Sequence, residues 1–283
     1  MEMEMEIPSM PKKCISSILS LTSPEDAIRL SLVASNFRSA ADSDAVWETF
    51  LPSDYKDIIS RAFDFSSSSL IFESKKDLYL RLCDSPLLID DGQLCFWLDK
   101  QTRKKCYMIA PRALHISWGD TPGCWKWISV PESRFPEVAV LLSVCWLEIR
   151  GRIKSSFLSP KTTYAAYLVF KLEDEHNGFT LDFEAADVSV GTNASTSQTR
   201  SAFLCHETWH QQSIWAHVPI EDINQKIEYP NKRSDGWFEV ELGEIFIKRD
   251  DGNLEMSVLE TKKQHRKTGL IVQGIEVRPK KGN

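Results

Sequence analysis

The sequence has no long hydrophobic run and no surplus of positive charge. None of its apolar stretches approaches the ~20 residues that a membrane-spanning helix needs, so we expect no membrane partner. Its 34 Lys and Arg residues are outnumbered by 40 Asp and Glu residues, which gives a net charge of −6. Because nucleic-acid-binding domains are typically strongly basic, this charge argues against a nucleic-acid partner.

The signals of a secretory or organellar route are also missing. Residues 1–6 alternate Met with Glu and have neither a basic segment nor an apolar core, unlike a signal or transit peptide, and we expect residues 1–9 to be disordered. The seven cysteines are an odd number and include no C-x-x-C pair. Free buried thiols in a reducing compartment are the simplest interpretation, and they predict a protein of the cytoplasm and nucleus.

Signatures of catalysis are scarce. The sequence contains no G-x-S-x-G motif, phosphate-binding loop or dinucleotide fingerprint, so we predict no cofactor and no catalytic residue. One pattern competes with this interpretation, namely His206-Glu207-Thr208-Trp209-His210, because H-E-x-x-H on a helix binds zinc through both His and uses Glu as a base. It lies in a long polar segment of a strand-rich region, with only Glu228 or His217 as a third ligand. A zinc hydrolase is therefore our third hypothesis.

The N-terminal segment, in contrast, has the apolar spacing of short helices. Ile15, Ile18 and Leu19 recur at i, i+3 and i+4, which places them on one helix face. Ser23-Pro24-Glu25-Asp26 is typical of a helix start, because Ser caps free N–H groups, Pro suits the first turn and acids favour the positive dipole end. The second helix carries Ala27, Leu30, Val33, Ala34 and Phe37, and a third, ending before Pro52, carries Val46, Trp47, Phe50 and Leu51.

This segment, residues 10–52, is too small to bury its own apolar faces well. Either the rest of the chain or a partner protein must cover them. The segment resembles an F-box in Met10-Pro11, Ile15-Ser-Ser-Ile18-Leu19, Ser23-Pro24-Glu25-Asp26-Ala27, Leu30-Ser-Leu-Val33, Phe37-Arg38 and Val46-Trp47. The resemblance implies docking on the Skp-type linker subunit of a cullin–RING ubiquitin ligase. By position, the implied docking residues are Pro11, Ile15, Ile18, Leu19, Leu30 and Val33.

Beyond residue 90 the spacing of the apolar residues changes from the spacing typical of helices to the alternation typical of strands. Residues 53–90 form a helical linker region in which Ser74 caps a helix, and residues 91–283 alternate apolar and polar positions between turn residues. Residues 133–142 are expected to form a short helix among the strands. This pattern predicts an α+β multidomain chain, a small helical module followed by an antiparallel β-sandwich. The predicted strands are residues 94–98, 105–109, 114–118, 144–153, 164–172, 237–242, 254–260 and 270–278.

Several motifs of this second part resemble the phloem protein 2 (Nictaba-like) lectin domain over about residues 93–279. The motifs are Arg112–Trp118, Trp125–Trp127, Val144–Gly151, Leu158–Lys171, Arg233–Trp237 with Glu241–Glu244, and Gly269–Pro279. The resemblance is weakest between residues 173 and 232. It implies a jelly-roll β-sandwich that binds glycans containing N-acetylglucosamine, and it implies sugar binding by Trp118 and Trp125.

The segment around these tryptophans offers flat apolar rings beside a turn-rich loop. An indole stacks on the apolar face of a pyranose, and a few polar groups complete such sites. Trp125 and Trp127 are two residues apart, so on a strand they share a face. Asp120 in the loop is a candidate polar contact. Trp146 and Trp237, within alternating strands, are expected to be core residues.

These features favour a substrate-recognition adaptor of a Skp–cullin–F-box ligase whose sandwich binds a glycan or glycoprotein. The alternative is an adaptor whose sandwich binds a protein surface without sugar. The apolar faces of the helical module are covered either by a partner protein or by the rest of this chain. If its own chain covers the module completely, no apolar surface is left for the linker subunit.

Overall fold

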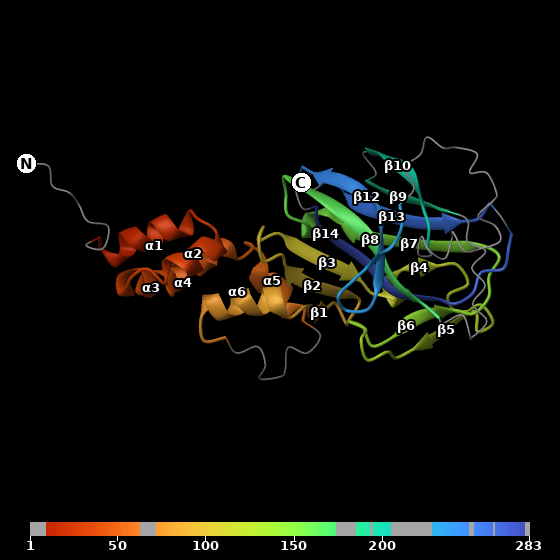
Figure 1. Cartoon of the computed structure of the whole chain (residues 1–283), viewed down its shortest axis with the longest axis horizontal. Helices are drawn as coiled ribbons and strands as arrows, with labels where there is room; N and C mark the ends of the chain where they lie inside the picture. The colour runs from red at the N-terminus through yellow and green to blue at the C-terminus, as the bar shows by residue number, and fades with distance from the viewer. Residues whose placement is uncertain are drawn as a thin grey trace, which may run out of the picture. The chain divides into compact units, whose positions relative to one another are not determined.

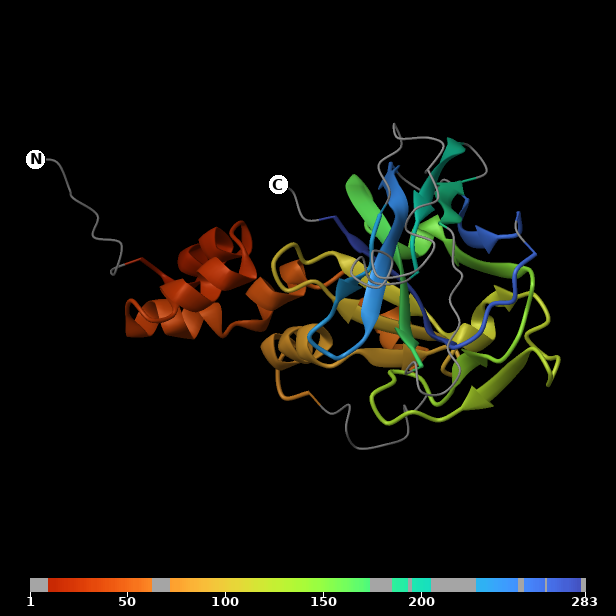
Figure 2. The same ribbon diagram turned by 45° about the vertical axis from the view of Figure 1, so that its right-hand side comes forward.

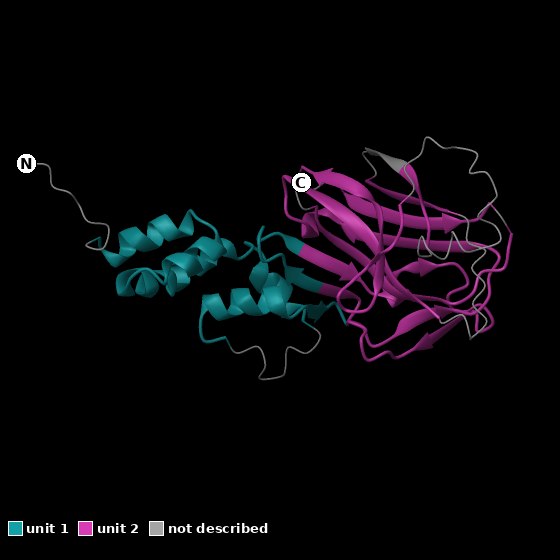
Figure 3. Cartoon of the chain, in the orientation of Figure 1, with its two compact units in different colours: residues 1–91, 96–105 teal, residues 92–95, 106–283 magenta. Residues whose placement is uncertain are grey.

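The computed structural model describes residues 10–62, 72–173, 185–192, 195–204, 228–248, 252–262 and 264–280. The chain divides into two compact units (Figure 3). The first comprises residues 1–91 and 96–105, and the second comprises residues 92–95 and 106–283. Each unit is built from one kind of secondary structure almost throughout, in agreement with the predicted fold class.

The first unit is mainly helical among its described residues (Figure 1). Two predicted caps are present, because the Ser23 hydroxyl accepts a hydrogen bond from the Asp26 N–H and the Ser74 hydroxyl accepts one from the Asp77 N–H, both at 3.1 Å. The helices are α1 (Lys12–Ser20), α2 (Pro24–Leu30), α3 (Ser35–Ala41), α4 (Asp44–Phe50), α5 (Tyr55–Ser60) and α6 (Lys75–Asp84).

The second predicted helix is in fact two helices. After Leu30 the N–H groups of Leu32 and Val33 bond to carbonyls three residues back, which tightens the chain into a turn. Ala34 is then extended, with φ −157° and ψ 161°, and α3 begins at the next residue. Val33 therefore lies in a turn instead of sharing a helix face with Phe37.

Aromatic packing forms the core of the helical unit. The buried Trp47 donates its indole N–H to the Ala41 carbonyl at 2.6 Å, which fixes α4 against the end of α3. Its ring centroid lies 5.5 Å from that of Phe50 and 5.4 Å from that of Tyr79, a residue of α6. Because α6 supplies Tyr79, the linker region covers part of the module's apolar surface.

The second unit is an antiparallel sandwich of two sheets, seen as layers in Figure 1 and, turned by 45°, in Figure 2. The larger sheet has the order β3-β14-β8-β12-β11, with β6 pairing to both β14 and β5, and the smaller has the order β10-β9-β13-β7-β4. The strands are β1 (Leu87–Ile89), β2 (Leu94–Leu98), β3 (Lys105–Ile109), β4 (His115–Ile116), β5 (Trp125–Ile128), β6 (Val138–Leu141), β7 (Leu147–Lys154), β8 (Thr162–Leu172), β9 (Ala186–Thr192), β10 (Ser195–Ala202), β11 (Asn231–Lys232), β12 (Phe238–Ile247), β13 (Asn253–Glu260) and β14 (Leu270–Pro279).

The sandwich core lies between the two sheets. Along β7, buried residues alternate with more exposed ones, as a half-buried strand requires. A Cβ at Gly151 of β7 would lie only 3.0 Å from the Ile275 side chain of β14 and 3.3 Å from that of Met256 of β13. The sheets therefore approach so closely at this point that only glycine fits without a shift.

Residues 138–141 form a strand, so the short helix predicted over residues 133–142 is wrong. Val138 and Ala139 pair with Ile128 and Trp127 of β5, and Val140 pairs with Ile271 of β14. The run Val-Ala-Val-Leu is buried throughout. Strand pairing on both sides therefore holds this segment in an extended conformation.

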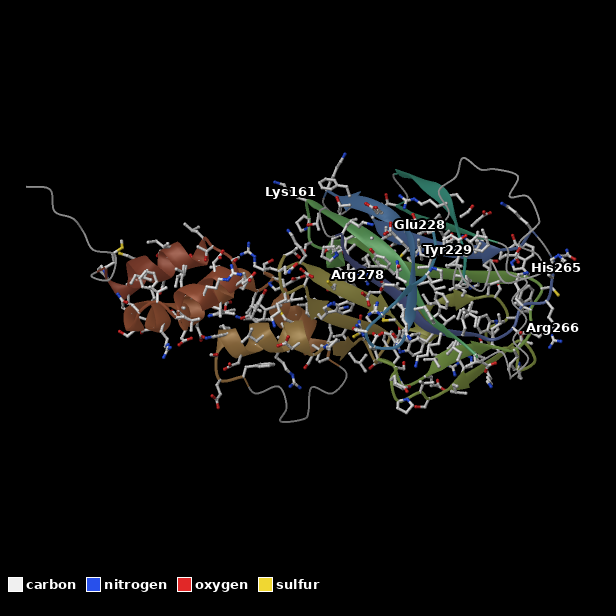
Figure 4. The ribbon with its side chains drawn as sticks, in the orientation of Figure 1. Lys161, Glu228, Tyr229, His265, Arg266 and Arg278 are labelled. Carbon is white, nitrogen blue, oxygen red and sulfur yellow. The ribbon has the colours of Figure 1, made fainter. Side chains whose placement is uncertain are left out.

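A cluster of charges lies across β12 and β14. Arg278, labelled in Figure 4, donates to both carboxylate oxygens of Glu239 at 2.6 and 2.9 Å, and its guanidinium lies 3.8 Å from the centroid of the Tyr167 ring. Glu276, only 2% exposed, pairs with Arg278, Arg134 and Arg233. Burial alone would raise the pKa of Glu239, but the hydrogen bonds from Arg278 and the charges of Arg278 and Arg233 hold that pKa below its ordinary value.

Candidate functional site

The residues predicted to dock the linker subunit separate into two groups. Ile18 is 48% exposed and Val33 is 68% exposed, Pro11 is also exposed, and Leu30 is half-buried. Ile15 and Leu19, at 1% and 0%, are buried in the helical core. In this structure both side chains pack inside the module, and their docking on the linker subunit stays a prediction.

The structure adds exposed apolar residues that the sequence interpretation missed. Leu21 is 88% exposed, Leu32 is 74% exposed and Ile28 is 36% exposed. The break after α2 explains the omission, because Leu32 belongs to the turn that the predicted continuous helix did not contain. We call Ile18, Leu21, Ile28, Leu32 and Val33 the exposed apolar set. They lie on α1, α2 and the turns that follow these helices.

A second candidate surface centres on Trp118 in the loop after β4. Its ring is 49% exposed, and its backbone has φ +58°, a left-handed conformation that costs about 1–3 kcal/mol for a non-glycine residue. The Gly119 N–H bonds to the Ile116 carbonyl at 2.9 Å, and the Thr121 N–H bonds to the Trp118 carbonyl at 2.9 Å. The loop therefore holds a bulky aromatic residue in a strained and half-exposed position.

Trp125 and Trp127 brace this loop from β5. The indole N–H of Trp125 donates to the Ser117 carbonyl at 3.1 Å, and that of Trp127 donates to the Gly119 carbonyl at 3.0 Å. Trp125 is 2% exposed, so in this structure it supports the loop, and its stacking on a sugar stays a prediction. The guanidinium of Arg112 lies 3.6 Å from the centroid of the Trp127 ring and covers one face of it.

Asp120, the predicted polar contact, lies in the same loop. Its side chain is fully exposed, and one carboxylate oxygen is 4.0 Å from a guanidinium nitrogen of Arg112. That distance is at the limit of an ion pair, and an exposed pair of this kind contributes little. Asp120 is thus accessible to a ligand, but nothing fixes the position of its carboxylate.

Trp146 is not a core residue, which corrects the prediction, whereas Trp237 is completely buried as expected. Trp146 is 44% exposed, and its indole N–H donates to Oε2 of Glu148 at 3.0 Å. The same oxygen accepts the Ser117 hydroxyl at 3.2 Å, and the Ser117 N–H bonds to the Glu148 carbonyl at 3.0 Å. Trp146 and Ser117, the residue before Trp118, therefore share one carboxylate oxygen.

The charge on this carboxylate is stabilised by its partners. Nε of Arg150 donates to Oε1 of Glu148 at 2.6 Å. The hydrogen bonds from Arg150, Trp146 and Ser117 hold the pKa of the Glu148 carboxyl below its ordinary value. Glu148 is consequently ionised at neutral pH. The sequence held a signal for this pair, because residues 146 and 148 are two apart and alternation places them on one strand face. Alternation alone could not show that this face is exposed to solvent.

Lys267 fixes the chain that leads into Trp146. It is 1% exposed, forms an ion pair with the buried Glu260, and donates its ammonium to the Cys145 carbonyl at 2.8 Å. The backbones of Val144 and Lys267 exchange two hydrogen bonds, at 3.1 and 2.7 Å. His265 and Arg266 precede Lys267 and lie at the end of the sandwich opposite Lys161 (Figure 4). The short segment before Trp146 is thus held by backbone and buried charge together.

The remaining predicted site lies outside the described residues. This is His206-Glu207-Thr208-Trp209-His210. Within the described part of the chain, no group of three His, Cys, Asp or Glu side chains could hold a metal ion. The described helices are also all too short or too polar to cross a membrane.

A helical module with an exposed apolar set, followed by an antiparallel sandwich that exposes Trp118 and Trp146, defines a two-domain protein. Two family models match this division, the F-box domain over residues 7–49 and phloem protein 2 over residues 104–279. The chain belongs to the F-box proteins that carry a phloem protein 2 domain.

Relatives of the same organisation match almost the whole chain. The Arabidopsis thaliana protein PP2-B12 is 47% identical over 272 residues, which cover 96% of this chain and 97% of that protein. The F-box protein PP2-B10 of the same species is 43% identical, covering 96% of this chain and 94% of that protein. A family 35 carbohydrate-binding module from Clostridium thermocellum overlaps 61% of this chain and 96% of the module, but its TM-score of 0.32 at 8% identity carries no argument.

Proposed function

We propose that this protein is the substrate-recognition adaptor of a Skp–cullin–F-box ubiquitin ligase. The observation that supports the helical half of the proposal is the exposed apolar set, which leaves five large apolar side chains uncovered on the F-box module. Large exposed apolar groups on a soluble module are typical of a protein interface. In this proposal the chain carries out no chemistry of its own, and it places a bound substrate near the ligase, which raises their effective concentration.

Binding to a purified Skp-type linker subunit tests this half. The double variant Leu32→Asp/Val33→Asp puts two charges into the proposed interface, so we expect at least a hundredfold loss of affinity with little change in thermal stability. The matched control is Phe246→Asp on β12, an exposed apolar residue of the second unit at 52% exposure. Equal binding by the double variant and the wild-type chain would contradict the proposal.

We further propose that the sandwich binds carbohydrate containing N-acetylglucosamine at Trp118. The observation that supports this proposal is a half-exposed indole held in a left-handed backbone conformation by a loop that two other tryptophans brace. Backbone strain of this kind concentrates at functional sites. An exposed indole with a braced backbone offers a preorganised flat surface to a pyranose ring.

Titration calorimetry with N,N′,N″-triacetylchitotriose tests the carbohydrate proposal. We expect binding by the wild-type chain and a loss of about thirtyfold in Trp118→Ala, the effect of removing one stacking contact. Phe246→Ala, which shortens an exposed aromatic residue elsewhere on the sandwich, is the control and should bind normally. If the wild-type chain binds neither this trimer nor any member of a glycan array, the sandwich recognises a protein surface instead.

A further inference from the structure

We propose that Trp146 and Glu148 complete the carbohydrate site begun by Trp118, and that this site selects uncharged sugars that offer a hydroxyl or amide hydrogen. This inference rests on the proposed function of the sandwich and deepens it. It assigns a second aromatic surface and one hydrogen-bond acceptor to the site. It also names the class of sugar that the site rejects.

The geometry places Trp146 and Ser117, the residue directly before Trp118, at one carboxylate. The Ser117 hydroxyl and the Trp146 indole N–H reach the same Glu148 oxygen, at 3.2 and 3.0 Å, and Trp118 follows Ser117 directly. Residue 117 is also tied to residue 148 through the backbone, at 3.0 Å. Trp118 and Trp146 are each about half exposed as residues, so each retains accessible surface for a ligand.

Both aromatic residues are held in place before any ligand binds. The loop of Trp118 is braced by the indole N–H groups of Trp125 and Trp127. The segment before Trp146 is held through the Cys145 carbonyl by Lys267, a buried cation paired with the buried Glu260. A site whose backbone is fixed in advance loses less conformational entropy when it binds a ligand, which favours affinity for a flexible oligosaccharide.

The hydrogen-bonding capacity of Glu148 determines what it can recognise. An ionised carboxylate has about four lone-pair positions and no hydrogen to donate. Three partners use three of these positions, since Ser117 and Trp146 donate to Oε2 and Arg150 donates to Oε1. The remaining position on Oε1 accepts a hydroxyl or amide N–H from a sugar.

The negative charges at this site should weaken the binding of sugars that carry a carboxylate. A carboxylated sugar would bring a second negative charge to Glu148, and the neighbouring cation, Arg150, is already engaged with that carboxylate at 2.6 Å. Asp120, exposed in the Trp118 loop, adds a further negative charge. Like charges in close contact are unfavourable, so uronic-acid chains should bind more weakly than uncharged chains of the same length.

The test uses the full chain and two probes, the uncharged triacetylchitotriose and the anionic trigalacturonate. The variants are Trp146→Ala, Glu148→Gln and Trp118→Ala, with Phe246→Ala as the control. We expect the wild-type chain to bind the uncharged trimer and to prefer it over trigalacturonate. Trp146→Ala should lose roughly tenfold or more in affinity for the uncharged trimer, and Glu148→Gln should bind it more weakly and lose the preference against the anionic one.

A spectroscopic readout separates contact from simple misfolding. Addition of triacetylchitotriose should shift the tryptophan emission of the wild-type chain, and the shift should shrink in Trp146→Ala while the melting temperature stays within a few degrees. Normal binding and an unchanged shift in both Trp146→Ala and Glu148→Gln, together with loss in Trp118→Ala, would overturn this inference and leave the carbohydrate proposal standing. No sugar binding by the wild-type chain would overturn both.

Discussion

Substitutions of Trp118 and of Trp125 should have different effects, the first mainly on sugar binding and the second mainly on stability. Trp118 is half exposed and contacts the sugar in the proposed site, whereas Trp125 is 2% exposed and packs within the fold. Trp118→Ala should therefore destabilise the fold less than Trp125→Ala does, because about half of the surface of Trp118 is already in contact with water. The same variant should lose about 2 kcal/mol of sugar-binding free energy, which is roughly thirtyfold in affinity.

Trp125→Ala should show the reverse order of effects. Removing a buried Trp typically costs about 3–5 kcal/mol of stability. The Ser117 carbonyl also loses its partner at 3.1 Å, which adds about 0.5–1.5 kcal/mol. For a protein of this size a loss of this magnitude lowers the melting temperature by roughly 10 °C. Trp125→Phe keeps one aromatic ring but loses the fused ring that carries the N–H, so its loss of stability should be smaller than that of Trp125→Ala.

Thermal melts and calorimetric titration with triacetylchitotriose, performed on the same protein preparations, measure both quantities. The reasoning fails if Trp125→Ala keeps its melting temperature and loses only sugar binding, because that result would make Trp125 a ligand contact. It also fails if Trp118→Ala lowers the melting temperature as much as Trp125→Ala does.

Further predictions concern the two units separately. Ile15→Ala should lower the stability of the helical module by about 2–5 kcal/mol, measured by denaturant unfolding, since Ile15 is 1% exposed. Lys267→Met leaves Glu260 charged and buried and should cost about 3–5 kcal/mol, and adding Glu260→Gln should recover most of this loss. The pKa of Glu239 is lowered in the fold, so its contribution to stability is present at neutral pH and lost as pH falls below the ordinary carboxylate range. Glu239→Gln should therefore flatten the acid limb of a stability–pH profile.

The sequence predicted the fold class and most strand positions because the patterns behind them are local. Ser23 and Ser74 mark helix starts through contacts within four residues, and the structure has both caps. Residues 138–141 were assigned to a helix because their strand partners, in β5 and β14, lie elsewhere in the sequence. Pairing partners distant in sequence leave no local mark that periodicity can detect.

The candidate sites show the same limit at the level of single residues. Helical spacing placed Ile15, Ile18 and Leu19 on one face, but it could not say that Ile18 lies at the open edge of that face. Trp146 and Trp237 both follow strand-like patterns, yet one is 44% exposed and the other is fully buried. A side chain on a helix or strand is exposed only if no other element packs over that face, and this packing depends on the whole fold.

The central claim is that one chain holds a ligase subunit and a glycan at the same time. A bridging measurement tests it most directly, with triacetylchitotriose immobilised on beads and a purified Skp-type linker subunit in solution. We predict that the beads retain the linker subunit only when the full chain is added, and that free trimer, Trp118→Ala or Leu32→Asp/Val33→Asp each abolishes retention. Retention that persists with Trp118→Ala, or no retention with the wild-type chain, would contradict the account.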